Sequence, residues 1–467
     1  MSAAPVRDQG ATIGRALRAR TVSIDPTTPV DLLAVAGTDG WLWERDRAGL
    51  AGRGEARRIR LRAGLGQAGA VAQVMEELGA IQCCDEVGLP GCGPIAVGAL
   101  PFDRDAPAEL IVPEVVVGRA PDGRCWLTTV GTGPAADAPA ILEALGPLAP
   151  EDPDGFALTS PIPHTEWMGL VAAAVGEIDA GVLDKVVLAR EVRVDANRRI
   201  HVPTVLRRLR SLYPMCTVVS AEAGPPSGRP GRQGSPSAGP GPIVGGAGAL
   251  PSGWIGGAGS DRFVAASPEL LVSRDGDRVR SQPLAGTIPR SGDPGVDRAL
   301  AEGLLGSAKD RAEHDWVVRD VERALAPWCS TMDVPDAPSI VSFRNVSHLG
   351  TLVEGRLAAA PGDRPSALAL AAALHPTAAV GGAPRREALA WLIAHEQLDR
   401  GPYAGPVGWV DARGDGEWVV GIRSAVISGS RARLFAGVGV VEGSDPAAEL
   451  AETQFKLQAL LAAVVRP

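Results

Sequence analysis

No stretch of about 18 uncharged apolar residues occurs in the 467-residue sequence, so the chain offers no candidate for a membrane-spanning helix. The segment from Met1 to Arg20 contains arginines but lacks the apolar run of a signal peptide. An excess of positive charge is also missing, because the net charge is −8 at pH 7, and this balance disfavours binding to nucleic acid. We therefore expect a soluble cytoplasmic protein that contacts neither a membrane nor nucleic acid.

Cysteine is scarce as well. The six cysteines are scattered over a long chain, unlike the dense spacing of a disulfide-stabilised protein. Cys83, Cys84 and Cys92 lie close together, but they lack CxxC spacing and have no histidine nearby, so a structural zinc site is disfavoured. We expect all six thiols to be reduced.

The composition is that of a globular protein, with 45% hydrophobic and 21% charged residues. The length allows one large mixed domain or several smaller ones. Residues 1–160 are predicted to hold mostly short strands, and they show no catalytic constellation, so we expect them to form the N-terminal part of a scaffold. Residues 161–467 carry the candidate catalytic residues. Within them, residues 224–253 are rich in Gly and Pro and are predicted to be a flexible surface insertion.

Two patterns in the second region predict particular elements. Ala299 to Leu325 is predicted to be one long helix whose apolar stripe, which includes Trp316, faces the core. The segments 263–273 and 278–287 are predicted to be the two arms of a β-hairpin that turns at Gly276.

Another helix is predicted to begin after Asp445, because this residue is a natural N-cap and Pro446 suits the first turn. Glu449, Glu452 and Lys456 follow at positions i, i+3 and i+7, which places two carboxylates and an ammonium group on one helical face. The same spacing is typical of a solvated face with ion pairs. The pattern by itself leaves open whether this face is only solvated or carries a functional site.

Three more charged residues stand beside apolar segments. Glu313 lies next to the apolar stripe of its helix and, with the two glutamates above, would suit a hard cation such as Mg²⁺. Lys185 begins an apolar strand, where a lysine is usually exposed but can act as a base once it is desolvated. Arg423 is either an ion-pair residue or a clamp for a substrate carboxylate. These residues alone predict a mixed α and β enzyme with an anionic ligand.

Several segments occur in an order typical of one known family. They are Ser267-Pro268-Glu269, Pro283-Leu284-Ala285-Gly286-Thr287, Lys309-Asp310-x-x-Glu313-His314, His375-Pro376-Thr377 with Gly381-Gly382, Tyr403-Ala404-Gly405-Pro406-Val407-Gly408, Gly421-Ile422-Arg423, and Ala436-Gly437-Val438-Gly439 through Lys456. In these motifs the chain resembles the chorismate-utilising enzymes, which include isochorismate synthase, anthranilate synthase component I, aminodeoxychorismate synthase component I and salicylate synthase. The resemblance covers Lys185 to Lys456, and weaker similarity reaches into the N-terminal part.

The resemblance implies an α+β fold, a large single domain in which two packed β-sheets are flanked by helices. It also implies a substrate, chorismate, whose ring carboxylate is bound through Mg²⁺. The implied metal ligands are Glu313 and Glu452, with Glu449 binding directly or through water. The implied substrate-binding residues are Gly286, Thr287, Ala379, Arg423, Gly437 and Lys456.

Members of this family differ in chemistry, and three positions bear on the choice between them. Ala285 stands where aminodeoxychorismate synthase has a nucleophilic lysine, so no covalent adduct forms there. Lys185 stands where anthranilate synthase has glutamine, so water is the implied nucleophile and no glutaminase subunit is expected. Ala379 stands where salicylate synthase has threonine, which favours isochorismate synthase and leaves salicylate synthase as the alternative.

The roles that the resemblance implies are those of an acid and a base. Neutral Lys185 would accept a proton from the water that attacks carbon 2, and protonated Glu269 would donate a proton to the departing carbon 4 hydroxyl. Desolvation shifts both pKa values in the direction this chemistry requires. A catalytically silent relative that only binds chorismate is the second alternative. Whether the product would feed siderophore or menaquinone synthesis stays open.

Overall fold

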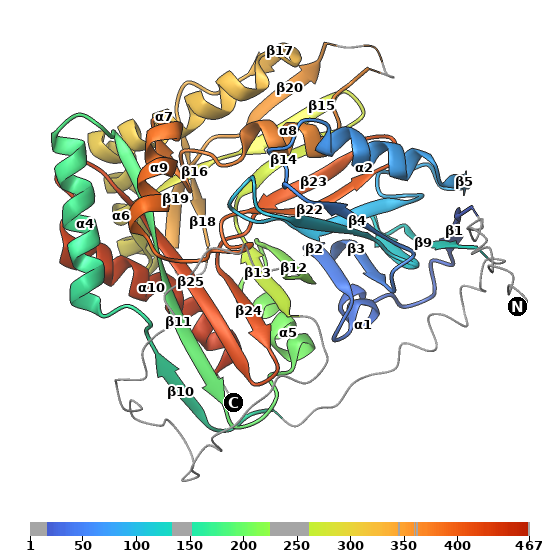
Figure 1. Ribbon diagram of the computed structural model, residues 1–467, viewed down its shortest axis with the longest axis horizontal. Coiled ribbons are helices and arrows are strands. Elements are labelled where there is room, and N and C mark those ends of the chain that lie inside the picture. Colours follow the sequence, from blue (N-terminus) through green and yellow to red (C-terminus); the bar gives the residue numbers. More distant parts are fainter. Residues whose placement is uncertain are drawn as a thin grey trace, which may run out of the picture.

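The computed structural model describes residues 16–132, 152–224, 261–343, 346–358, 360 and 363–465. Two large β-sheets and a small third sheet make up most of this part of the chain, with helices packed around them (Figure 1). The predicted α+β fold with two packed sheets and flanking helices is confirmed, and the third sheet was not predicted. The predicted insertion at residues 224–253 lies, apart from Gly224, outside the described residues.

The larger sheet has 13 strands in the described residues. Its strands are, in spatial order, β10 (Phe156–Thr159), β11 (Lys185–Ala196), β25 (Arg431–Val440), β24 (Ser424–Ser428), β13 (Arg262–Ser267), β12 (Thr217–Glu222), β2 (Trp41–Arg45), β3 (Ala48–Arg53), β8 (Val115–Arg119), β9 (Cys125–Gly131), β1 (Arg18–Ile24) and β5 (Gln82–Asp85), and β21 (Gly382–Ala383) also pairs with β11. Neighbouring strands are antiparallel except for β1 and β5.

The second sheet has nine strands and the third has three, again counting the described residues. The strands of the second are, in order, β17 (Cys329–Asp333), β20 (Val353–Leu357), β15 (Arg278–Gln282), β14 (Leu270–Asp275), β23 (Gly416–Val420), β22 (Pro406–Asp411), β6 (Ile95–Ala99), β7 (Ala108–Val112) and β4 (Arg57–Leu61). The third sheet consists of β16 (Leu284–Pro289), β19 (Val346–Gly350) and β18 (Ser339–Ser342). Strands from both sides of residue 160 share the two large sheets, and the domain boundary at residue 160 stays a prediction.

Helices cover the outer faces of the sheets. The described helices are α1 (Leu32–Ala36), α2 (Ala70–Gly79), α4 (His164–Asp179), α5 (Val202–Leu212), α6 (Pro294–Gly306), α7 (Ala308–Leu325), α8 (Ala367–Leu374), α9 (Arg385–His395) and α10 (Pro446–Val464). Helices α1, α5 and α10 pack on the larger sheet, α2 and α8 on the nine-stranded sheet, and α6 and α7 on the third. Within the described ranges, every helix is too short or too polar to cross a bilayer.

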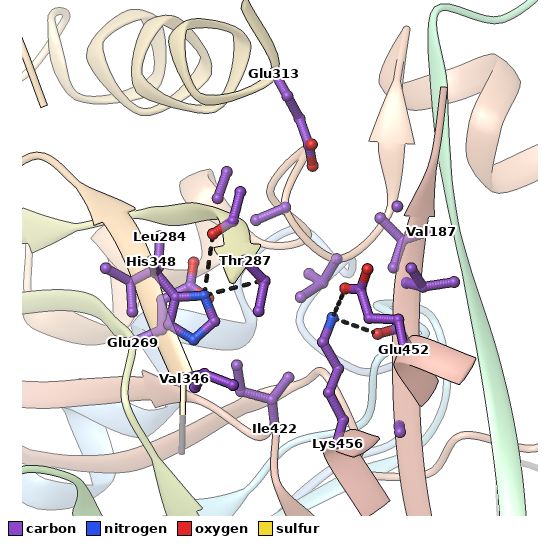
Figure 2. Close-up of a pocket in the computed structure, with 18 of the residues that line it drawn as sticks. Val187, Glu269, Leu284, Thr287, Glu313, Val346, His348, Ile422, Glu452 and Lys456 are labelled. Atoms are coloured by element: carbon purple, nitrogen blue, oxygen red, sulfur yellow. Dashed lines mark hydrogen bonds and ion pairs between the residues drawn. The ribbon is translucent and has the colours of Figure 1, made fainter. Parts of the chain in front are cut away.

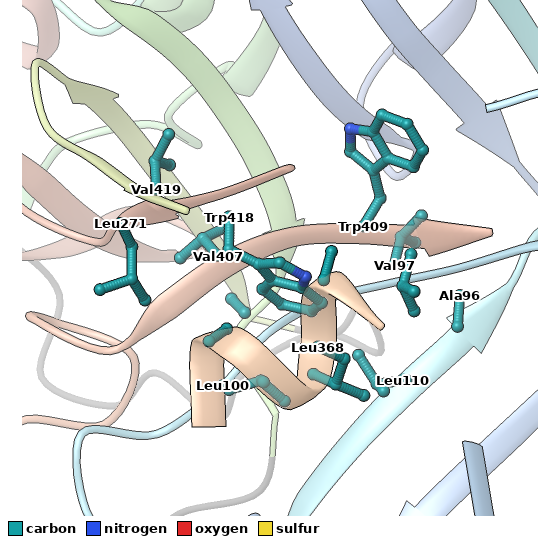
Figure 3. Close-up of a cluster of buried hydrophobic side chains, with 14 of the residues drawn as sticks. Ala96, Val97, Leu100, Leu110, Leu271, Leu368, Val407, Trp409, Trp418 and Val419 are labelled. Atoms are coloured by element: carbon teal, nitrogen blue, oxygen red, sulfur yellow. The ribbon is translucent and has the colours of Figure 1, made fainter. Parts of the chain in front are cut away.

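A continuous apolar core joins the two large sheets. Trp43 and Leu50 of the larger sheet share one buried cluster with Val97 and Trp409 of the nine-stranded sheet. Figure 3 shows part of this cluster, in which Trp418 of β23 lies beside helix α8. Because both sheets bury one face against the other, neither can separate without exposing a large apolar area to water.

The predicted hairpin turn at Gly276 is confirmed, but the two predicted strands, 263–273 and 278–287, are too long. β14 and β15 pair as predicted. However, the chain leaves the larger sheet after Ser267 and enters the nine-stranded sheet at Leu270, and after Gln282 it passes into the third sheet. Pro268 and Pro283 mark these two crossings, since proline cannot donate to a continuing ladder.

The predicted single helix from residue 299 to residue 325 is two helices. Ser307 has an extended backbone, with ψ of 114°, ends α6 and caps α7 by accepting a hydrogen bond from the Asp310 N–H. A serine at such a position competes for backbone hydrogen bonds, which explains the break. The expectation that Trp316 faces the core is wrong, because its side chain is 48% exposed. The predicted start of the C-terminal helix is confirmed, since Asp445 caps α10 and Pro446 is its first residue.

The packing of the core predicts that alanine substitution of two leucines will affect the free energy of unfolding very differently. Leu110 is fully buried in β7, whereas Leu352 is 39% exposed in the turn before β20. Leu110→Ala should lower the free energy of unfolding by about 2 to 5 kcal/mol, because it removes apolar contacts and leaves a cavity. Leu352→Ala should change it by about 0.5 kcal/mol or less. Guanidinium denaturation followed by tryptophan fluorescence measures both values, and equal losses would contradict the packing described above.

Candidate active site

One pocket brings together all the site residues predicted from the sequence. It lies where β11, β16 and β25 meet helices α7 and α10 (Figure 2). The predicted residues that line it are Lys185, Glu269, Gly286, Thr287, Glu313, Ala379, Arg423, Gly437, Glu449, Glu452 and Lys456. They come from segments almost three hundred residues apart in sequence, so only the folded chain assembles them. Their chemical roles stay predictions.

Lys185 is the first residue of β11 and is only 4% exposed. Its Nζ donates a hydrogen bond to Glu313 Oε1 at 2.7 Å, so a carboxylate from α7 meets an ammonium from the larger sheet. Gly439 makes this contact possible: a Cβ there would lie 2.8 Å from Lys185 Cε and 3.1 Å from Glu313 Oε1. Any side chain at this position would therefore displace the lysine or the glutamate.

Glu269 lies at the crossing between the two large sheets and is 4% exposed. Burial raises the pKa of its carboxyl group to about 8, against opposing effects from the Leu284 N–H and the charge of Lys185. The group is thus mostly protonated at pH 7, the state that a general acid needs. Lys185 and Glu269 line the same pocket.

Arg423 is held at the pocket wall in an unusual conformation. Its φ of 49° lies in the left-handed region, and its guanidinium lies 4.8 Å from the centre of the Phe343 ring. Arg423 Nη2 is 2.9 Å from His348 Nε2. His348 Nδ1 is 3.2 Å from the Gly286 carbonyl oxygen and 3.0 Å from Thr287 Oγ1.

This chain of contacts assigns the protonation of His348. Burial first, and then the charges of Arg423 and Lys456, keep its pKa well below the ordinary value of 6.5, so the ring is neutral. Nδ1 can then donate to Gly286, and Nε2 can accept from Arg423. The histidine therefore orients the arginine toward the pocket and joins it to the segment that carries Gly286 and Thr287.

The three candidate metal ligands all line the pocket. Lys456 Nζ lies 2.7 Å from Glu452 Oε1 and donates to the Gly437 carbonyl oxygen at 3.0 Å (Figure 2). Glu449 is buried, and desolvation raises the pKa of its carboxyl group despite a hydrogen bond from Ser444. Glu313 and Glu452 thus each have a lysine as counter-ion.

These carboxylates fit a hard divalent cation. The described residues contain no preformed cluster of three acidic or other metal-binding side chains. Mg²⁺ does not require one, because proteins commonly hold it with one or two carboxylates, several waters and oxygens of the substrate. A cation nearby would also favour the charged form of the buried Glu449 carboxyl group.

Sequence reasoning missed several residues of the pocket. Lys309, Asp310, Tyr403 and His348 all line it. The first three fall inside the quoted motifs, so the motifs themselves held the signal. His348 lies within a fully buried strand, and a histidine in such an apolar segment was the available clue. Its partners come from distant segments, which the sequence does not reveal.

Comparison with known proteins places these observations in a family. A family model described as a chorismate binding enzyme matches residues 11–226 and 254–465. The chain is 39% identical over 382 residues to the MenF protein of Mycobacterium tuberculosis, covering 80% of this chain and 87% of that protein. It is 35% identical over 382 residues to the isochorismate synthase DhbC of Bacillus subtilis, and the match covers 79% of this chain and 81% of that protein. The crystal structure of DhbC from Bacillus anthracis matches with a TM-score of 0.71 and 33% identity, covering 92% of this chain and 98% of that one.

Glu269 predicts a measurable dependence of stability on pH. Its folded pKa of about 8 lies above its ordinary value of 4.5, so the folded state binds a proton that the unfolded state releases. Stability must then fall as pH rises from about 4.5 to about 8. Glu269→Gln mimics the protonated carboxyl and does not titrate, so its melting temperature should exceed that of the wild type by an increment that grows between pH 5 and pH 8. The exposed Glu302→Gln is the control and should show no such growth.

Proposed function

This chain belongs to the chorismate-binding enzyme family, and from that premise we propose that it is an isochorismate synthase, an isomerase that converts chorismate into isochorismate. The observation that carries the proposal is the presence of a buried lysine and a protonated glutamic acid in one pocket, Lys185 and Glu269. Related proteins that are named isochorismate synthases match this chain over most of its length, which supports the same reaction.

Chorismate is a dicarboxylate, and the pocket offers two places for negative charge. Arg423 and Lys456 would hold the enolpyruvyl carboxylate, with backbone groups at Gly286 and Gly437 and the Thr287 hydroxyl completing the cradle. The ring carboxylate would lie toward the glutamate side of the pocket. Mg²⁺, when bound by Glu313 and Glu452 with Glu449 nearby, supplies the positive charge that anchors this carboxylate.

The acid and the base then divide the chemistry. In the reactive form of the site Lys185 is the neutral amine, no longer the ammonium that pairs with Glu313, and it accepts a proton from a water molecule as the water oxygen forms a bond to carbon 2. Glu269 donates its proton to the carbon 4 hydroxyl, the C–O bond at carbon 4 breaks, and the ring double bonds shift. One water enters and one leaves, so the product is an isomer of the substrate. Burial supports the protonated state of Glu269, as described above.

Two residues argue against other reactions in the family. Ala285 lines the pocket and has no amino group, so a covalent lysine intermediate cannot form at this position. Ala379 also lines the pocket and lacks the hydroxyl that salicylate synthase has at the matching position. Salicylate synthase, which eliminates pyruvate after isochorismate formation, is therefore the alternative. A catalytically silent chorismate-binding relative is disfavoured because the acid and the base are both present.

The proposal predicts a product that can be identified directly. Purified protein incubated with chorismate and Mg²⁺ should form isochorismate without pyruvate, and EDTA should abolish turnover. Chromatography with mass spectrometry identifies the products. Salicylate with an equal amount of pyruvate would move the assignment to salicylate synthase. Turnover that persists after metal removal would overturn the proposed role of Mg²⁺, and no turnover with metal would overturn the proposed function.

The assigned roles predict that two variants fail in different ways. Lys185→Ala removes the base and should lower kcat by about 100-fold to 10,000-fold while chorismate still binds. Arg423→Lys retains the charge but loses the planar fork, so KM for chorismate should rise by about 10-fold with a smaller change in kcat. Steady-state kinetics and calorimetric binding measure both effects. A Lys185→Ala enzyme with near-normal kcat would exclude lysine as the base.

A further inference from the structure

Strand β11, which delivers Lys185 to the pocket, has an incomplete edge. Along one edge it pairs with β25 from Val186 to Asp195. Along the other, β21 pairs only with residues 185–186 and β10 only with residues 193–196. Between these two short strands no neighbouring strand is available in the described residues, although backbone groups buried here must find hydrogen-bond partners.

Side chains from helix α4 and from the segment that follows α9 take the place of the missing strand. Arg400 Nη2 donates to the Val187 carbonyl oxygen at 2.6 Å. The Ala189 N–H donates to Glu396 Oε1 at 2.7 Å, and the indole N–H of Trp167 donates to the Ala189 carbonyl oxygen at 3.0 Å. The gap in the ladder is thereby bridged by a carboxylate, a guanidinium and an indole.

The central members of this bridge, Glu396 and Arg400, form a buried ion pair. Their side chains are 5% and 3% exposed. Arg400 Nε donates to Glu396 Oε2 at 2.7 Å, and Nη2 donates to Oε1 at 2.6 Å. The guanidinium also lies 4.2 Å from the centre of the Phe102 ring. A buried pair is costly unless its remaining hydrogen bonds are satisfied, and here they are satisfied by backbone atoms of the pocket walls.

Glu396 and Arg400 contact three segments that line the active site, two through the ion pair and one through the Arg400 backbone. Val187, whose carbonyl the ion pair holds, lines the pocket two residues beyond Lys185. Arg400 Nη1 donates to the carbonyl oxygen of Val380 at 3.0 Å, and Val380 lines the pocket beside Ala379. The Arg400 carbonyl oxygen accepts from the N–H of Tyr403, another lining residue.

We propose that Glu396 and Arg400 are positioning residues for the acid–base reaction: their buried ion pair acts as a substitute strand that sets the base Lys185 against the loop that carries Ala379 and Val380. Neither residue lines the active-site pocket, so they act through the backbone that they hold. The inference rests on the proposed function. It differs from a purely structural role because it ties this pair to the placement of the catalytic base and not only to folding.

Arg400→Lys is the first test. Lysine keeps the charge but cannot reach Val187, Val380 and both carboxylate oxygens together. We expect kcat for isochorismate formation to fall by about 10-fold to 100-fold, because a displacement of about 1 Å at the base is costly. KM for chorismate should change by less than about 3-fold, since the carboxylate clamp, Arg423 and Lys456, stands on other elements.

A matched control separates positioning from general destabilisation. Arg274 is another buried arginine with a carboxylate partner, Asp415, at 3.6 Å, and it donates to the backbone carbonyls of Gly276 and Pro365. It lies outside the active-site pocket. Arg274→Lys should lower the melting temperature as Arg400→Lys does, but kcat should change by less than about 2-fold. Equal kcat losses in the two variants would overturn the inference.

Hydrogen exchange supplies a readout that does not need turnover. In Arg400→Lys, amides in the peptide that contains Val187 and Ala189 should exchange at least 10-fold faster than in the wild type, with no such change in Arg274→Lys. If Arg400→Lys does not fold, Glu396→Gln takes its place, since it keeps the size of the side chain but removes the charge that pairs with Arg400. A wild-type kcat and unchanged exchange in the variant would refute the positioning role alone, whereas a wild-type protein inert toward chorismate would refute the proposed function as well.

Discussion

The antiparallel ladder between β11 and β25 joins residues 186–195 to residues 431–440, and the pocket is organised around it. Lys185 is the first residue of β11, and its side chain lies against Gly439 of β25. Gly439 leaves room for the lysine, and the chain then turns into α10, which carries Glu452 and Lys456. The proposed base, the proposed metal site and half of the proposed substrate clamp are thus fixed relative to one another by one strand pair and the helix that follows it.

Desolvation sets the chemistry of the opposite wall. Glu269 occupies the short crossing between the two large sheets, where bulk water is excluded and burial raises its pKa to about 8. The same exclusion of water keeps His348 neutral, so it can accept a hydrogen bond from Arg423. Burial at the junction of the sheets therefore accounts both for the protonation of Glu269 at neutral pH and for the contact that holds Arg423, the proposed carboxylate ligand.

Ion pairs in this molecule serve two different purposes. Lys185 with Glu313 and Lys456 with Glu452 join groups of opposite charge at the pocket, and each carboxylate is available to a cation that competes with its lysine. The buried pair of Glu396 and Arg400, by contrast, is held by three backbone partners, at Val187, Ala189 and Val380. Ion pairs whose partners can be replaced by a ligand suit a site that binds charged molecules. An ion pair whose hydrogen bonds are all satisfied suits a rigid part of the structure.

Much of this protein was determined by its sequence alone. The cap and first turn of α10 and the turn at Gly276 follow from local chemistry, because these features depend on neighbours in sequence. The α+β class and the identity of the candidate site residues follow from the ordered motifs of a known family, although only folding brings these residues into one pocket. Only the tertiary structure decided the exposure of Trp316, the third sheet and the contacts of His348. Each of these depends on what packs against a segment from far along the chain, and hydrogen bonds and desolvation between distant residues leave no mark on the local pattern.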